Sequence, residues 1–544
     1  MNTAKAKKYL GSVVVASLLC LTASCRSAPN HEVVDTILVN GKILTVDKNF
    51  SVASALAVKG SRIVAVGSDS SIRNMAAAKT RVIDLQGKTV IPGLIDNHMH
   101  FIRAVQRWNL QARIDGINSR AEALSIISKK AASLPPGAWL MVQGGWRENQ
   151  FADKPGGFTL EELDAAAPRN PLFLQQTYTA VYANSLALRA VGVSPSTGAL
   201  HQGPPLISPQ PPYGKLNEQM PAVSDDQLKQ NLKDFIAVLN RAGLTSVYDV
   251  GRPPEGDITL LEKVSAAGPL PLRVWNTLKY EAYDAKGADA AVELIHKTKP
   301  NTTSDYLGML GLGEHLYLPF FDLPGLTKPY GDDIVGQYMK IATAAAMGGF
   351  NIQEHTMLDQ EVKSLLGPFE ALDKKVSLKP LRWNLAHVLN ISDESIRRAN
   401  ALGLTLGVHS VAMYGSPQMQ PPIRSIQDSG IAWGLGTDST IVSAYQPFIT
   451  LGWVVSGKSI NGKTVIEKPV TRQEALIAHT RSNAYLLFKE KDLGTLEAGK
   501  FADLVVLDRD YITIPADDIF NIRPVMTMVG GRVVFEAPVA ASGQ

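Results

Sequence analysis

The segment with the clearest potential for chemistry is residues 91–100, which read Ile-Pro-Gly-Leu-Ile-Asp-Asn-His-Met-His. Successive side chains of a β-strand point to opposite faces, so His98 and His100 share one face and Met99 points to the other. Two imidazoles that share a face at the end of a strand can hold one divalent cation. A lone His-x-His pair is more often structural, but the apolar strand and the Pro-Gly turn before it favour a metal site.

The cysteines narrow the range of metal ligands. The chain has two, Cys20 and Cys25, and both lie in an N-terminal leader. We therefore expect neither a disulfide nor a Cys nucleophile nor a thiolate metal site in the mature fold. Any metal must be held by His and carboxylate side chains. A Ser-His-Asp hydrolase is not indicated either, because the sequence has no Gly-x-Ser-x-Gly elbow.

Residues 1–25 have the pattern of an export signal. Three lysines at positions 5, 7 and 8 precede an apolar run at 10–21 and then small residues. That run is shorter than the roughly 20 residues that span a bilayer. Cys25 follows Leu-Thr-Ala-Ser, which is similar to the bacterial lipobox, although the leucine stands one position too early. We expect an exported protein, with a lipid on Cys25 anchoring it to the bacterial envelope, or a soluble periplasmic enzyme as the alternative.

Positioning two histidines at a strand end requires a scaffold, and the middle of the chain predicts an α/β barrel. Apolar strand-like runs alternate with helical segments between residues 90 and 487, which is typical of βα units around a parallel sheet. Eight runs stand out, a number that favours a closed (β/α)8 TIM-type barrel: 90–95, 246–249, 273–277, 307–312, 350–355, 382–385, 404–408 and 431–436. The span exceeds the roughly 250 residues of a plain barrel. We assign the excess to an insert after the first strand, at about 105–240, that roofs the active site.

Both chain ends are rich in short alternating strands. Residues 31–89 contain an Asn-Gly turn signal between two such strands, and residues 488–540 repeat the texture. Neither end is long enough to bury a core alone. We therefore expect one discontinuous β-sandwich built from both ends of the chain.

The whole pattern resembles the amidohydrolase superfamily. The resemblance rests on Val-Ile-Pro-Gly-Leu-Ile-Asp-x-His-x-His at 90–100 and on Leu-Gly-Thr-Leu-Glu-Ala-Gly-Lys-Phe-Ala-Asp-Leu-Val at 493–505. Within the superfamily, Trp146 and its neighbourhood, residues 171–184 and residues 242–249 are similar to the YtcJ-like branch, which includes N-substituted formamide deformylases. The likeness covers nearly the whole mature chain.

The resemblance implies further metal ligands at later strand ends, namely His355, His387 and Asp438. Asp359 fits the family's His-x-x-x-Asp, but a polar residue at a helix start is at least as good an explanation. Ala386 stands where the family usually has Glu. At the fourth strand Glu314 occupies the position of the branch's lysine and could bridge two cations, or be a surface residue after a turn. One metal or two therefore both remain open.

The resemblance also implies hydrolysis at a divalent metal, with Zn2+ the first candidate and Mn2+, Fe2+ or Co2+ the others. Metal-activated water would attack a carbon–nitrogen bond, with Asp438 as proton shuttle. Ester or lactone hydrolysis is the enzymatic alternative, and a non-catalytic surface barrel is the other one. His409 could polarise the carbonyl, but a structural role is expected. No role is predicted for the other histidines: His31, His201, His296, His315 and His479.

The sequence says less about the molecules that this protein binds. The net charge of +4 is small for 544 residues, so we expect a small-molecule substrate and no nucleic acid. Contact with a membrane is expected only through the lipid on Cys25, and a homodimer is a guess from the family. Some aromatic side chains could line an apolar pocket but are more often core, namely Trp108, Trp139, Trp146, Phe151 and Tyr178.

Overall fold

The computed structural model describes residues 33–178, 180–194, 199–201, 213–250, 255–280, 282–302, 304–320, 330–416 and 419–538. The leader and Cys25 lie outside the described residues, so the predicted export signal is not visible. Within the described ranges, no helix combines the length and the apolar character needed to cross a membrane.

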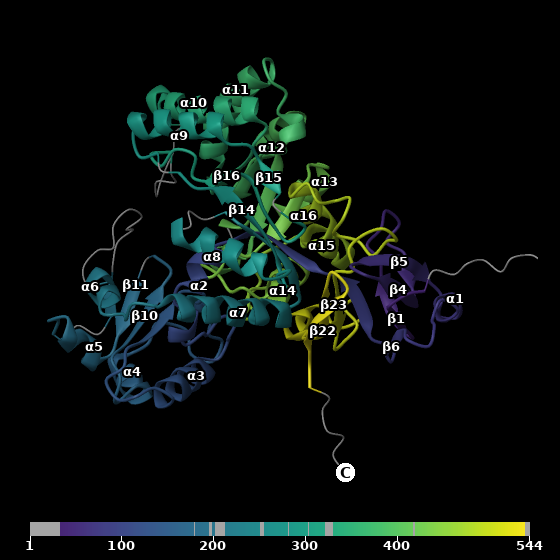
Figure 1. Ribbon diagram of the computed structural model, residues 1–544. Helices are drawn as coiled ribbons and strands as arrows, with labels where there is room; N and C mark the ends of the chain where they lie inside the picture. The colour runs from purple at the N-terminus through teal and green to yellow at the C-terminus, as the bar shows by residue number, and fades with distance from the viewer. Residues whose placement is uncertain are drawn as a thin grey trace, which may run out of the picture.

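Eight parallel strands form the centre of the molecule and confirm the barrel prediction (Figure 1). In spatial order they are β8 (Leu94–Met99), β13 (Leu244–Asp249), β14 (Arg273–Leu278), β16 (Leu307–Glu314), β17 (Asn351–Thr356), β18 (Asn384–His387), β19 (Thr405–His409) and β20 (Trp433–Gly436). A short strand, β15 (Asn301–Thr302), pairs antiparallel with β16. The predicted first strand, residues 90–95, was misplaced. Gly93 separates β7 (Thr89–Pro92), which belongs to another sheet, from the barrel strand β8.

Helices connect the barrel strands, and three more follow the last barrel strand within the described residues. They are α7 (Asp225–Arg241), α8 (Glu255–Ala266), α9 (Ala285–Lys297), α10 (Asp332–Gly348), α11 (Asp359–Asp373), α12 (Asp393–Ala401), α13 (Ile423–Asp428), α14 (Pro447–Ser456), α15 (Arg472–His479) and α16 (Arg481–Leu486). The first of them shows why such segments are helical. Ser224 caps α7 by accepting from the Gln227 amide, and Leu232, Phe235 and Leu239 place a buried stripe on one face.

Strands from both chain ends share one sheet, as predicted. Its order is β23 (Arg532–Glu536), β22 (Pro524–Val529), β21 (Leu504–Leu507), β7, β2 (Lys42–Leu44) and β3 (Val52–Ala53). A second sheet contains β5 (Arg62–Gly67), β4 (Ala55–Lys59), β1 (Thr36–Val39) and β6 (Arg81–Asp84), next to helix α1 (Asp69–Arg73). Leu38, Leu56, Leu504 and Met528 meet in one apolar core between them, so each end of the chain buries the other.

The insert forms a separate lobe, blue in Figure 1, away from the β-sandwich. Its sheet has the order β12 (Ala199–His201), β11 (Ala180–Ala183), β10 (Leu172–Gln176) and β9 (Leu140–Gln143). The helices of this lobe are α3 (Arg120–Ala132), α4 (Leu160–Ala166), α5 (Ser185–Ala190) and α6 (Tyr213–Glu218). Trp146 and Phe151 are fully buried in its core, so these two aromatic side chains do not line a pocket.

A buried ion pair joins the barrel to the sandwich. The Arg273 guanidinium in β14 is fully buried and donates through Nε and Nη2 to the two Asp503 oxygens, at 2.8 and 2.9 Å. Asp503 also accepts from the Gly530 amide at 2.8 Å, and the ring of Phe501 lies 4.1 Å from the guanidinium carbon. Removing one charge from such a pair leaves the other buried and uncompensated.

We expect Asp503→Asn to lower the free energy of unfolding by about 3 kcal/mol, because it strands the Arg273 cation. Urea denaturation followed by tryptophan fluorescence measures the change. Asp226→Asn is the control, since its pair with Lys229 is exposed and contributes at most about 1 kcal/mol. Equal stability of the two variants would contradict the assigned role of the Arg273–Asp503 pair.

Candidate metal centre

Five barrel strands deliver the predicted ligands to one end of the barrel. His98 lies in β8 and His100 directly follows it, while Glu314 and His387 are the last residues of β16 and β18. His355 lies near the end of β17, and Asp438 is two residues beyond β20. Because parallel strands end at the same rim, side chains that are far apart in the sequence meet there.

The structure brings all six predicted residues together. Glu314 Oε2 lies 2.8 Å from His98 Nε2, 3.7 Å from His387 Nε2 and 3.9 Å from His355 Nδ1. On the other side, Asp438 Oδ1 lies 3.2 Å from His100 Nε2. The Glu314 carboxylate is therefore the hub of the cluster, and the alternative of a surface residue does not apply.

Two groups of potential ligands share Glu314. One group is His98, His100, Glu314 and Asp438, and the other is Glu314, His315 and His355; the donor atoms within each group lie within 4.8 Å of one another. His315 had no predicted role, and its Nε2 lies 3.3 Å from Glu314 Oε1. Strand alternation would point His315 away from Glu314, but β16 ends at Glu314, so that rule no longer holds for the next residue.

The donor set fits a divalent cation. His98 Nε2, His387 Nε2 and Glu314 Oε2 are buried and close to one another, but none of these atoms makes a hydrogen bond of good geometry among the described residues. Buried polar atoms are normally satisfied, so several such atoms close together indicate a missing ligand. Imidazole and carboxylate are the ligands of catalytic zinc, and other first-row divalent metals accept them as well.

The protonation of His387, Glu314 and Asp438 favours metal binding, whereas the Glu314 and Asp438 carboxylates raise the pKa of His98 against the effect of burial, so a cation must displace a proton there. Burial lowers the pKa of His387 to about 4, so its ring is neutral near pH 7. Burial would raise the pKa of Glu314, but the surrounding imidazoles hold it well below its ordinary value. Burial acts in the same direction on Asp438, whose pKa is nevertheless lowered by His387, His100 and His98. Ionised carboxylates and neutral imidazoles are the forms that coordinate metals.

A chain of hydrogen bonds sets the tautomer of His387. Asn483 Nδ2 donates to the carbonyls of Ile95 and Leu435, so its Oδ1 accepts from Asn97 Nδ2 at 2.8 Å. Asn97 Oδ1 must then accept, and His409 Nε2 is its donor at 3.2 Å. Burial lowers the pKa of His409 far below its usual value, so this ring is neutral and its Nδ1 is an acceptor.

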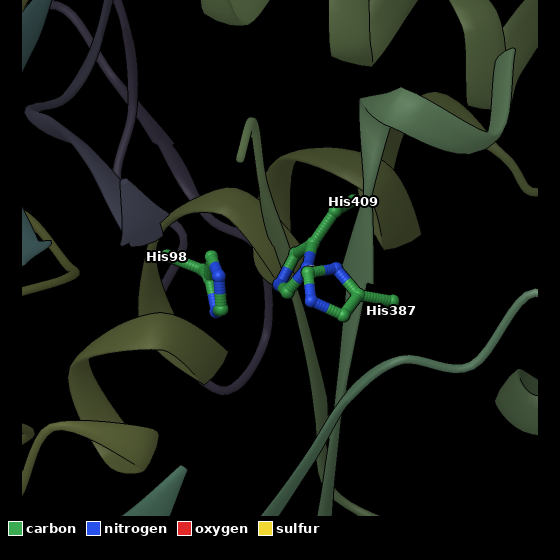
Figure 2. A group of neighbouring side chains, drawn as sticks. All are labelled: His98, His387 and His409. Atoms are coloured by element: carbon green, nitrogen blue, oxygen red, sulfur yellow. The ribbon is translucent and has the colours of Figure 1, made fainter. Parts of the chain in front are cut away.

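His387 is consequently protonated on Nδ1 and donates to His409 Nδ1 over 2.8 Å. Its Nε2 lone pair is left facing Glu314. Figure 2 shows the rings of His387 and His409 directed toward each other, with His98 beside them. The expected structural role of His409 agrees with this arrangement, in which it fixes the ring of a metal ligand.

Asp96 ties the first barrel strand to the last. Its carboxylate accepts from the amides of His98 and Thr437 at 3.1 and 3.0 Å and from the Thr437 hydroxyl at 2.5 Å. Burial raises its pKa to about 6. Two backbone bonds join the same strand ends, from Asp438 N to the His98 carbonyl and from His100 N to the Ser439 carbonyl, both 2.8 Å. A Cβ on Gly436 would collide with Asn97.

Asp359 lies outside the cluster. It begins helix α11, accepts from the amide and hydroxyl of Ser392 at 2.9 and 3.0 Å, and pairs with Lys363 at 2.7 Å. Asp359 therefore has the contacts of a helix-start residue and not those of a metal ligand.

Among the aromatic side chains that the sequence singled out, Trp108 packs against Phe235 of α7, with ring centroids 4.2 Å apart and the rings tilted by 37°.

Comparison with known proteins assigns the class. A buried His and carboxylate cluster at the carboxyl end of an eight-stranded barrel is the arrangement of metal-dependent hydrolases. The sequence profile of the Amidohydrolase family matches residues 81–535, so this chain belongs to the amidohydrolase family.

Among its relatives, the N-substituted formamide deformylase of Arthrobacter pascens is 24% identical, over 92% of this chain and 98% of that protein. YtcJ of Bacillus subtilis (strain 168) is 26% identical, over 84% and 91%. A metal-dependent hydrolase from Pyrococcus horikoshii shares the fold with a TM-score of 0.61, at 18% identity, over 88% and 99% of the two chains. The TrzN enzyme of Arthrobacter aurescens TC1, in complex with zinc and atraton, has a TM-score of 0.54 at 16% identity, over 94% and 97%.

We expect His409→Phe to weaken binding of the metal by about 10- to 100-fold, because His387 loses the partner that fixes its tautomer. Competition with a chromophoric chelator measures the affinity directly, without an activity assay. The exposed His296 in α9 provides the control His296→Ala, which should bind metal like the wild type. Unchanged affinity in a folded His409→Phe protein would refute the proton arrangement.

Proposed function

We propose that this protein is a metal-dependent hydrolase that cleaves a carbon–nitrogen bond of a small-molecule amide. The observation that carries the proposal is the convergence of His and carboxylate donors from five barrel strands at one end of the barrel, in groups whose donor atoms lie within 4.8 Å of one another. Membership of the amidohydrolase family supports the reaction type, and so does the similarity to a protein named as a formamide deformylase. A non-catalytic barrel is disfavoured, because such a barrel has no reason to keep this set of buried metal-ligand side chains together.

The resident cation is proposed to be Zn2+, with two ions per chain. Glu314 belongs to both ligand groups and offers two oxygens, so a single carboxylate can serve two cations. His98, His100 and Asp438 would complete one site. His315, His355 and His387 would complete the other. This assignment needs no modified lysine.

The chemistry divides between the cation and Asp438. A divalent cation held here would lower the pKa of a bound water toward neutrality and so supply a nucleophile near pH 7. Asp438 would be the base for that water, since its carboxylate is ionised and lies beside the proposed ligands His100 and His387. It takes a proton from the attacking water and returns it to the nitrogen of the departing amine. The reaction is then balanced: the carbon–nitrogen bond breaks, a carbon–oxygen bond forms, and the amine leaves protonated.

Elemental analysis of purified protein, with an amide and ester library, tests the proposal. We expect about two zinc equivalents, loss of most metal in His98→Ala, and a 10²- to 10⁴-fold fall in kcat in metal-loaded Asp438→Asn. A folded protein that binds no metal after reconstitution would overturn the proposal. Faster cleavage of esters than of matched amides would instead support the ester or lactone alternative.

We also propose export with a lipid on Cys25, and a homodimer in solution. We expect the full-length protein in the membrane fraction of a bacterial host and Cys25→Ala in the periplasmic fraction, because the variant lacks the acylated thiol. Immunoblotting of the fractions measures this, and light scattering of the mature protein measures its mass. Wild-type protein in the periplasmic fraction would leave only the soluble alternative.

A further inference from the structure

Two arginines beside the metal centre have no carboxylate partner among the described residues. They are Arg103, in the short helix α2 (Phe101–Val105), and Arg147, which follows strand β9 of the insert. Arg103 Nε and Nη2 and Arg147 Nε are buried and have no hydrogen-bond partner. A guanidinium stays charged in proteins, and burying it unpaired is costly, so these atoms indicate a ligand.

Arg103 is placed next to the metal ligands by the fold. His100 is the N-cap of α2, and Arg103 is three residues further on the same helical face. Its Nη1 donates to the Tyr178 hydroxyl at 2.8 Å. Burial raises the pKa of Tyr178, and the Asp438 and Glu314 carboxylates raise it further. The Arg103–Tyr178 pair therefore lies within electrostatic reach of the cluster.

The edge of Arg103 that lacks a partner is the edge that binds carboxylates. Nε and Nη2 point to the same side and form two parallel hydrogen bonds with a carboxylate. Four other arginines of this chain use that edge against a carboxylate: Arg113 with Asp115, Arg120 with Glu162, Arg273 with Asp503 and Arg398 with Glu370. In Arg103 the same edge is buried and free, while Nη1 holds it in position through Tyr178.

Arg147 approaches from the insert. Gly145, two residues earlier, donates its amide to the Ile441 carbonyl at 2.9 Å, three residues beyond Asp438. The Arg147 guanidinium carbon lies 5.8 Å from the centre of the Tyr414 ring. Burial lowers the pKa of Arg147, while Tyr414 and Asp438 raise it. The backbone near Arg147 is therefore tied to the segment that follows Asp438, and the Arg147 guanidinium interacts electrostatically with the Asp438 carboxylate.

Neutralising the metal-ligand carboxylates does not account for these arginines. Glu314 and Asp438 are already surrounded by imidazoles, and divalent cations would make the centre net positive. Two more positive charges would then repel the metal ions unless an anion joined the site. Since protein carboxylates at ion-pair distance are lacking among the described residues, that anion has to come with the substrate.

We propose that Arg103, held by Tyr178 and assisted by Arg147, is the binding site for a carboxylate of the substrate, which makes the substrate class N-acyl amino acids rather than neutral amides. This inference rests on the proposed hydrolysis of an amide. The carboxylate takes two hydrogen bonds from the Nε and Nη2 edge, and the neighbouring amide carbonyl is thereby oriented at the metal centre. Arg103 acts as a specificity-determining residue and takes no part in bond cleavage.

The test compares N-acyl amino acids with matched N-alkyl amides in which a methyl group replaces the carboxylate. The metal-loaded wild type should favour the acids in kcat/KM. Arg103→Gln should lower kcat/KM for the acids by about 10- to 100-fold, mainly through KM, and change the neutral amides less than about threefold. Tyr178→Phe should lower kcat/KM for the acids by a smaller factor. Arg107→Gln is the control, because Arg107 donates to Asn217 instead and should behave like the wild type.

A binding measurement separates this inference from the proposed reaction. An N-benzyl amino acid keeps the carboxylate but has no amide bond, and calorimetry should show about tenfold weaker binding to Arg103→Gln than to the wild type. If this loss is seen while no amide is cleaved, the carboxylate site stands and the hydrolase proposal fails. Equal kcat/KM for acids and neutral amides, or unchanged binding in folded Arg103→Gln, overturns the carboxylate site and leaves the hydrolase proposal intact. Preference for N-acyl aminophosphonates would overturn the carboxylate assignment in favour of a phosphonate-sized anion.

Discussion

The junction between β8 and β20, the first and last strands of the barrel, is the contact on which the metal centre depends. At this junction Asp96 binds both strands, and the backbones of His98, His100, Asp438 and Ser439 are joined by two hydrogen bonds. Three candidate ligands therefore lie on the junction itself. The hydrogen bonds that join the first barrel strand to the last also hold these three ligands together. Loosening the junction would therefore separate His98 and His100 from Asp438.

The remaining ligands depend on strand ends rather than on this junction. Glu314, His355 and His387 each stand at or next to the last residue of a strand, and their positions relative to one another follow from the parallel register of β16, β17 and β18. The side-chain amides of Asn483 and Asn97 link the backbone to His409, which in turn orients His387. The glycines of β20 leave the space that these amides need. Asn97, Asn483 and His409 all have hydrogen-bond partners for their buried side chains, which a polar network in a protein interior requires.

Much of this could be predicted from the sequence, because buried parallel strands are apolar runs and the His-x-His pair follows such a run directly. The start of the first barrel strand could not be predicted, because β7 and β8 are both apolar and only the strand pairing shows that Gly93 separates them. The contacts of His315 and His409 could not be predicted from the sequence either. Each depends on contacts between strands that are distant in sequence, and neither residue belongs to a local pattern. The free edge of Arg103 could not be predicted either, because it depends on which side chains from other elements approach the guanidinium.

The sheet that both chain ends share affects how the protein folds during its synthesis. Strand β7 pairs with β21, more than 400 residues later in the chain. At a synthesis rate of about 5–20 residues per second, the N-terminal strands wait on the order of 20–80 s for their partner. During that time their apolar faces are uncovered while the chain is still on the ribosome. The N-terminal half of the sandwich therefore stays exposed to aggregation until synthesis is nearly complete, and truncation near the C-terminus would leave it permanently without a partner.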